Sequence, residues 1–191
     1  MTKGRLEAFT DGVIAILITI MVLELHTPHG TTWAALHESL PVLLTYVLSF
    51  VYLGIYWNNH HHMLHATERV NGAVLWANLH LLFWLSLVPF TTAWMGENHF
   101  AALPTAVYGG VLMLAGCAYS VLRATIIRCN GAHSRLATAT GNDLKGKISV
   151  LLYAFAIPMA FFSPWIAYSV YTAVAVIWIC PDRRIESKLG A

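Results

Sequence analysis

The sequence is poor in charge. Only 10% of its 191 residues are charged, with 11 Lys or Arg and 9 Asp or Glu, whereas 58% are hydrophobic. Soluble domains carry roughly 25% charged residues, so this composition excludes an ordinary soluble domain and favours an all-α integral membrane protein. The net charge of +2 is small and no long basic run is present, which argues against a nucleic acid partner.

Cysteine is scarce as well. Cys117, Cys129 and Cys180 are too few and too scattered for a disulfide framework or a CxxC metal site, and we expect them to be small apolar fillers. The sequence also lacks a nucleophile paired with a base and a phosphate-binding loop. These absences predict that the chain is not an enzyme and carries no cofactor.

Long apolar runs are what the sequence has instead. A helix that crosses a bilayer needs about 20 mainly apolar residues. Six runs qualify, at about 8–25, 40–60, 73–94, 102–122, 147–162 and 164–181. Nothing is left over for a soluble domain, so residues 1–191 are expected to form a single six-helix transmembrane domain. Gly109, Gly110 and Gly116 in the fourth run predict close packing against another helix.

The basic residues predict an orientation for this domain. All eleven lie before the first run, between the second and third, between the fourth and fifth, or after the sixth. They are Lys3, Arg5, Arg69, Arg123, Arg128, Arg135, Lys145, Lys147, Arg183, Arg184 and Lys188. Because basic connections stay on the cytoplasmic side, both termini are expected in the cytoplasm, with the chain in the cell (inner) membrane.

The first run begins with a carboxylate. Asp11 lies about one turn inside it, where an ionisable group is costly and marks either an ion path or a packing contact. The residues that share one helical face are Gly12, Ile16, Thr19, Ile20 and Leu23. Asp11 lies about 100° from that face, so we expect it to face neighbouring helices, as a structural lock or as an ion ligand. Its candidate partners are Arg5, the Asn58–His62 cluster, Asn78 and His80.

Histidines near the end of the second run raise the question of a metal site. His61 and His65 are four residues apart on one helical face, a spacing at which two imidazoles can share Zn²⁺. Further ligands would have to come from Glu68 or Asp11, so we favour solvated, hydrogen-bonding histidines and expect no bound metal. His80, inside the third run, raises a haem alternative, which neither a second deep histidine nor a CxxCH motif supports.

The start of the chain also carries a family resemblance. The segment Arg5-x-x-x-Phe9-Thr10-Asp11 resembles the Arg-x-x-x-Phe-Ser-Asp signature of the endolysosomal and bacterial potassium channel family, the transmembrane protein 175 family. Two later segments are also similar to that family: Tyr56-Trp57-x-x-His60-His61, and the stretch from Asn78-Leu79 to Leu87-Val88-Pro89-Phe90-Thr91. A single repeat of six spans resembles the prokaryotic form, which implies a homotetramer.

The resemblance implies a potassium-permeable cation channel of weak to moderate K⁺ selectivity, with four copies of the first helix around a central pore. The TVGYG filter of other potassium channels is absent here. By offset from the signature, Ile16 is the implied constriction on the cytoplasmic side. Ile20 and Leu23 are implied further apolar rings, and Thr19 is an implied polar layer between them. The implied partners are other copies of the chain, the lipid bilayer and monovalent cations.

The resemblance gives the signature residues a bracing role. Arg5, Phe9, Thr10 and Asp11 would hold the first helix against the second and third, with His61, His62, Asn78 and His80 as their polar partners. Thr10 stands where the signature has serine. Threonine keeps the hydroxyl of serine and adds a methyl group. An alternative function stays open, a proton-coupled or metal-ion transporter that uses Asp11 and the His60–His65 cluster as titrating ligands.

Overall fold

The computed structural model describes residues 2–140 and 143–179, and all regular structure within them is helical. The helices are α1 (Lys3–Leu23), α2 (Trp33–Glu38), α3 (Leu40–His65), α4 (Gly72–Ser86), α5 (Val88–Glu97), α6 (Ala102–Asn130), α7 (Arg135–Thr140), α8 (Leu144–Met159) and α9 (Pro164–Ile179). Residues 180–181 of the sixth expected run, with Cys180, Arg183, Arg184 and Lys188, lie outside the described residues. The described chain is thus all-helical, as its composition predicts.

Among the described residues, four stretches are long and apolar enough to cross a membrane: α1, α3, α4 together with α5, and α6. Helices α8 and α9 are shorter, with 16 residues each. The third expected run is interrupted at Leu87, which separates α4 from α5. Pro89 in the first turn of α5 explains the break, because proline has no N–H to donate to the carbonyl four residues earlier.

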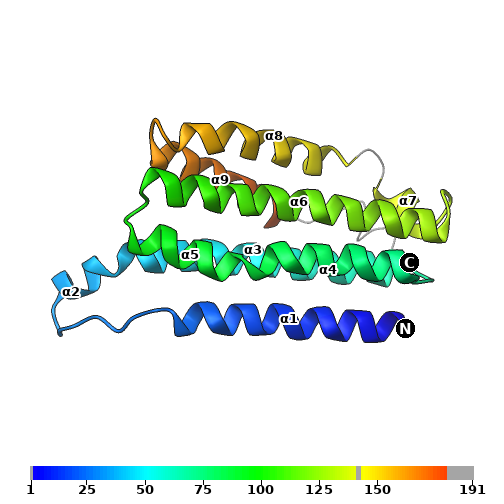
Figure 1. Ribbon diagram of the computed structural model, residues 1–191, viewed down its shortest axis with the longest axis horizontal. Coiled ribbons are helices and arrows are strands. Elements are labelled where there is room, and N and C mark those ends of the chain that lie inside the picture. Colours follow the sequence, from blue (N-terminus) through cyan, green and yellow to red (C-terminus); the bar gives the residue numbers. More distant parts are fainter. Residues whose placement is uncertain (1, 141–142, 180–191) are drawn as a thin grey trace.

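The long helices lie side by side in layers (Figure 1). Helix α1 forms one edge of the bundle and packs against α3, α4 and α5. Helix α6 lies further inside, in contact with α4 and α5 and also with α8 and α9. Within the chain, α1 therefore has long neighbours on one side only.

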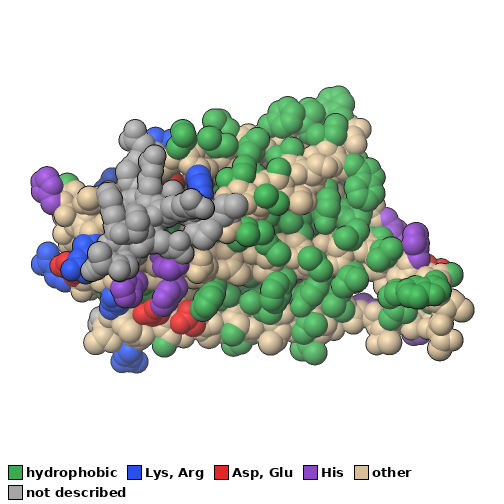
Figure 2. Space-filling model, turned by 180° about the vertical axis from the view of Figure 1, so that it is seen from behind, with side chains coloured by type: hydrophobic (Ala, Val, Ile, Leu, Met, Phe, Trp, Pro, Cys, Tyr) green, Lys and Arg blue, Asp and Glu red, His purple; other side chains and the backbone are tan. Residues whose placement is uncertain are grey.

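Charged side chains collect at the ends of the bundle. Figure 2 shows hydrophobic side chains over the middle of one face, with Lys, Arg, Asp, Glu and His at one end and a second group of His at the other. The end rich in Lys and Arg holds the start of α1. This distribution is typical of helices whose middle lies in hydrocarbon and whose ends reach water.

Candidate functional site

The two sides of α1 differ in what covers them. The buried side chains are Leu6, Thr10, Ile14, Leu17 and Met21. The opposite side carries an exposed row, which we call the α1 stripe: Arg5, Phe9, Gly12, Ile16, Thr19, Ile20 and Leu23. Most successive members are three or four residues apart, which is the spacing of one helical face. The stripe runs almost the whole length of the helix.

The α1 stripe is mostly apolar. Ile16 is 58% exposed and Leu23 is 81% exposed, so these side chains are left for lipid, water or another chain to contact. Thr19 donates its hydroxyl to the carbonyl of Ile16 at 2.8 Å, so this O–H needs no partner outside the helix. Its oxygen can still accept on the outer surface. Between Ile16 and Leu23 the stripe therefore presents aliphatic side chains with one hydroxyl among them.

A buried chain of hydrogen bonds holds the opposite side of α1. Asn78 of α4 donates its side-chain N–H to Thr10 Oγ1 at 2.9 Å, and Thr10 donates in turn to the carbonyl of Leu6 at 3.0 Å. His60 of α3 shares a 2.8 Å hydrogen bond with the side-chain oxygen of Asn78. All three polar side chains are buried, so this network joins α1, α3 and α4 away from water.

The network also assigns the proton on His60. Because the Asn78 N–H points at Thr10, the Asn78 oxygen must accept from His60, and Nε2 of the neutral ring carries the hydrogen. His60 Nδ1 is then an acceptor, and it is buried without a partner among the described residues. The network is therefore directional, running from α3 through α4 to α1.

A second set of contacts follows the edge of the same interface, and we call it the α1–α3 ladder. Lys3 Nζ donates to the carbonyl of His65 at 3.2 Å, Glu7 Oε1 lies 3.0 Å from His61 Nδ1, and Trp57 Nε1 donates to Asp11 Oδ1 at 3.0 Å. From one contact to the next, the residue number rises by four on α1 and falls by four on α3. This is the pattern of two helices that pack antiparallel. Its side chains reach water, so each rung stabilises less than a buried bond.

These contacts divide the signature residues into two pairs. Thr10 and Asp11 face the neighbouring helices, whereas Arg5 and Phe9 lie on the α1 stripe. Phe9 is 48% exposed, so in the single chain it does not brace α1 against α3 or α4. Asp11 has Trp57 as its hydrogen-bond partner, a residue that was not among those expected for it.

The histidines expected as partners of the signature residues make other contacts. His61 contacts Glu7 in the ladder, and His62 packs edge-on against the ring of His61 at 5.6 Å between centroids. The exposed His80 accepts a hydrogen bond from Trp84 on its own helix at 3.0 Å. The histidine that reaches the buried network is His60. Three consecutive helical residues point about 100° apart. The packing of α3 decides which of them is buried, so no local sequence signal distinguishes His60.

Metal binding finds no support in the described part of the chain. It contains no group of three or more His, Cys, Asp or Glu side chains that could hold a metal ion. The rings of His61 and His65 are 6.4 Å apart between their centroids. Glu7 contacts His61 as a hydrogen-bonding rung of the ladder.

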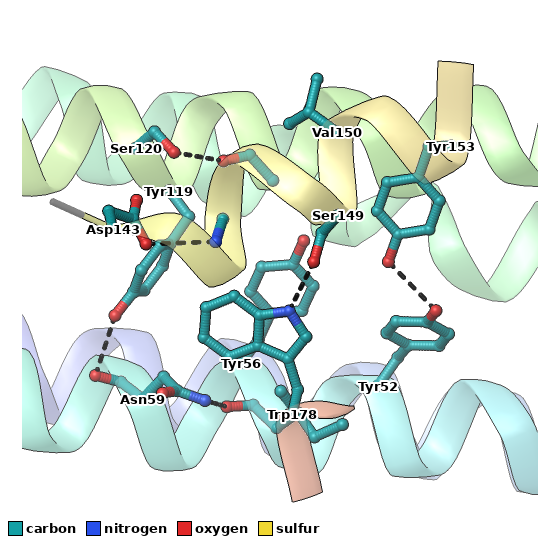
Figure 3. A pocket seen from close by; sticks show the side chains of 13 residues that line it. Tyr52, Tyr56, Asn59, Tyr119, Ser120, Asp143, Ser149, Val150, Tyr153 and Trp178 are labelled. Atoms are coloured by element: carbon teal, nitrogen blue, oxygen red, sulfur yellow. Dashed lines mark hydrogen bonds between the residues drawn. The ribbon is translucent and has the colours of Figure 1, made fainter. Parts of the chain in front are cut away.

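A pocket lies between α3, α6, α8 and α9 (Figure 3). It contains about 510 Å³ of space between its walls, part of it open to the outside. Many of its polar groups bond to one another: Tyr153 donates to Tyr52 at 3.0 Å, Trp178 to Ser149 at 2.8 Å, and Tyr119 to the carbonyl of Asn59 at 3.2 Å. These bonds cross between helices, so they stabilise the bundle.

Comparison with known proteins finds relatives along nearly the whole chain. Residues 5–89 match the family model described as endosomal/lysosomal potassium channel TMEM175. A potassium channel of Chryseobacterium sp. (strain P1-3) is 54% identical over 189 residues, which cover 99% of this chain and 98% of the relative. A potassium channel of Chamaesiphon minutus is 29% identical, with 91% of each chain covered.

A solved structure and animal proteins are similar too. The crystal structure of a lysosomal potassium-selective channel TMEM175 homolog from Chamaesiphon minutus matches with a TM-score of 0.78 and 28% identity, over 93% of this chain and 96% of that one. The human endosomal/lysosomal proton channel TMEM175 is 33% identical over 96 residues, which cover 44% of this chain and 19% of the human protein. The likeness to the bacterial proteins is therefore the more complete.

Proposed function

The chain belongs to the TMEM175 potassium channel family, and we propose that it is a potassium-permeable cation channel in which four copies of α1 line a central path. Membership of an ion channel family also means that the chain is not an enzyme and needs no cofactor. The permeating ion is K⁺, and the partners are the lipid bilayer and three further copies of the chain.

The exposed α1 stripe carries this proposal. A face that met lipid alone would gain nothing from the hydroxyl of Thr19, because polar groups are costly in hydrocarbon. In four copies of the chain arranged around one axis, the α1 stripes would bury one another's exposed side chains and line a narrow passage. A passage narrowed by aliphatic rings excludes water when closed and passes a partly hydrated cation when it widens.

Four of the stripe residues then take roles in the pore. Ile16 is the constriction on the cytoplasmic side, Ile20 and Leu23 form further apolar rings, and Thr19 is the polar layer between them. A hydrophobic gate of this kind has no cage of carbonyl oxygens. The preference for K⁺ over Na⁺ is therefore weak to moderate and rests on the easier dehydration of K⁺. Thr10 and Asp11 keep α1 in register with α3 and α4.

We assign the chain to the cell (inner) membrane as one domain, residues 1–191, with six spans and both termini in the cytoplasm. The spans are α1, α3, α4 with α5, α6, α8 and α9. A helix of 16 residues is roughly 24 Å long, so α8 requires local thinning of the bilayer or flanking residues that reach its surface. The basic residues at the start of α1 and beside α7 support this orientation.

The test is a selectivity measurement on Ile16→Asn. An amide in place of the aliphatic ring would wet the constriction, so we expect a larger leak and a reversal potential, under opposed K⁺ and Na⁺ gradients, closer to that of a non-selective pore. The measurement uses the full chain in planar bilayers. Val121→Asn is the matched control, because Val121 is an exposed aliphatic residue (48%) on α6, which is not one of the helices that α1 packs against.

Two results would contradict the proposal. The first is near-zero conductance of the wild-type protein for both ions. The second is saturable, pH-coupled flux that His61→Ala abolishes while the protein stays folded, which would favour the transporter alternative.

A further inference from the structure

Arg5 differs from the other charged residues at the start of α1. Lys3, Glu7 and Asp11 all contact α3 through the ladder. Arg5 is exposed, and no hydrogen bond or ion pair joins it to another side chain within residues 2–140 and 143–179. Within the described part of the chain, its charge is therefore not used to hold the fold.

Arg5 also lies in line with the proposed conduction path. It shares the α1 stripe with Ile16, eleven residues further on, which is about 16 Å along a helix axis. The end of α1 that carries Arg5 is the end of the bundle rich in Lys and Arg. Four copies of α1 around one axis would therefore bring four guanidinium groups to the same mouth of the pore.

We propose, on the basis of the proposed channel function, that Arg5 makes K⁺ conduction differ between the outward and the inward direction. A ring of four positive charges at the cytoplasmic mouth lowers the local concentration of K⁺ there, so K⁺ enters less readily from the cytoplasm than from the outside. At about 10 Å from the axis, four charges in water, screened by about 0.1 M salt, reduce local K⁺ about two- to threefold. At about 1 M salt the screening length falls to about 3 Å and the reduction disappears.

A charge series at this position tests the proposal: Arg5→Lys keeps the charge, Arg5→Gln removes it and Arg5→Glu reverses it. The measurement is the ratio of outward to inward single-channel conductance in inside-out patches with equal KCl on both sides. At about 0.1 M KCl we expect a low ratio for the wild type and Arg5→Lys, a ratio about two- to threefold higher for Arg5→Gln, and a higher one still for Arg5→Glu. At about 1 M KCl all four ratios should converge.

The matched control is Arg128→Gln, which removes an exposed arginine from the last turn of α6. Helix α6 packs on α4, α5, α8 and α9, so this change should leave the ratio unaltered. Equal ratios across the series would overturn the inference. So would loss of current in Arg5→Lys together with Arg5→Gln, because a structural brace needs the guanidinium and not only its charge. A silent wild type would instead overturn the channel proposal itself.

Discussion

Helices α6 and α1 are both long and apolar, but the protein holds them in different ways. Helix α6 contacts four helices, α4, α5, α8 and α9. Seven of its side chains are fully buried: Thr105, Tyr108, Leu112, Ala115, Ala118, Leu122 and Ile126. Helix α1 is covered along one side only. A helix packed on several sides cannot change shape or position cheaply. A helix held along one side keeps its other side for a partner or an ion. Helix α6 therefore maintains the fold, and α1 carries the proposed function.

The largest effect should come from filling space inside the α6 packing. A Cβ at Gly109 would overlap the hydroxyl end of Tyr171 on α9, which is fully buried and donates to the carbonyl of Thr105 at 3.2 Å. We expect Gly109→Ala to lower the free energy of unfolding by about 1–3 kcal/mol, because the ring has no free space to move into. Thermal melting of the purified protein, followed by tryptophan fluorescence, measures this loss.

Gly110 supplies the control for that substitution. It is the next residue of the same helix, but a Cβ there meets no atom within 4 Å. Gly110→Ala should leave the melting temperature unchanged or raise it slightly, since alanine is the better helix former. Equal destabilisation by both changes would show that helix propensity, not packing against α9, is responsible.

A smaller effect should separate the two sides of α1. Thr10 and Thr19 lie on the same helix, but Thr10 is fully buried in the hydrogen-bond network and Thr19 is exposed on the stripe. Thr10→Val leaves the Asn78 amide N–H without its acceptor, so we expect a loss of about 1–2 kcal/mol in stability. Thr19→Val removes a hydroxyl that serves only its own helix in the single chain, so the melting temperature should not change.

Conduction should respond in the opposite order. If Thr19 supplies the polar layer of the pore, Thr19→Val lowers the K⁺ over Na⁺ preference, which reversal potentials measure. A Thr10→Val channel that still folds should keep the wild-type preference. The division of α1 into a holding side and a working side would be wrong if Thr19→Val destabilised the protein and left selectivity intact.

Much of this division was predictable from local patterns. The apolar runs predicted the long helices, and the spacing of Ile16, Thr19, Ile20 and Leu23 alone predicted their common face, which the structure leaves exposed. Gly109, Gly110 and Gly116 predicted close helix packing, and Gly109 makes the closest approach, against Tyr171. Neighbouring helical residues point about 100° apart, so the pattern could not say which of the three glycines does so.

Contacts between helices were harder to predict, because they depend on register. The bond between Asp11 and Trp57 and the burial of His60 both require the antiparallel offset of α1 and α3, which no local pattern encodes. The placement of Arg5 and Phe9, in contrast, follows from helical spacing and not from register. The signature groups them with Thr10 and Asp11, but helical geometry turns them to the opposite side.

The smallest effect should come from the ladder. Glu7→Gln keeps an oxygen that can accept from His61 and removes the carboxylate charge, and both side chains of this pair reach water. An exposed pair contributes about 0.2–1 kcal/mol, so the melting temperature should fall slightly at low salt and less at high salt, where the charge is screened. Glu68→Gln is the control, because the Glu68 side chain has no hydrogen-bond or ion-pair partner within the described residues. If Glu7→Gln cost as much stability as Thr10→Val, the ladder would stabilise the position of α1 as strongly as the buried network does. The side of α1 that maintains the fold would then include its water-exposed edge.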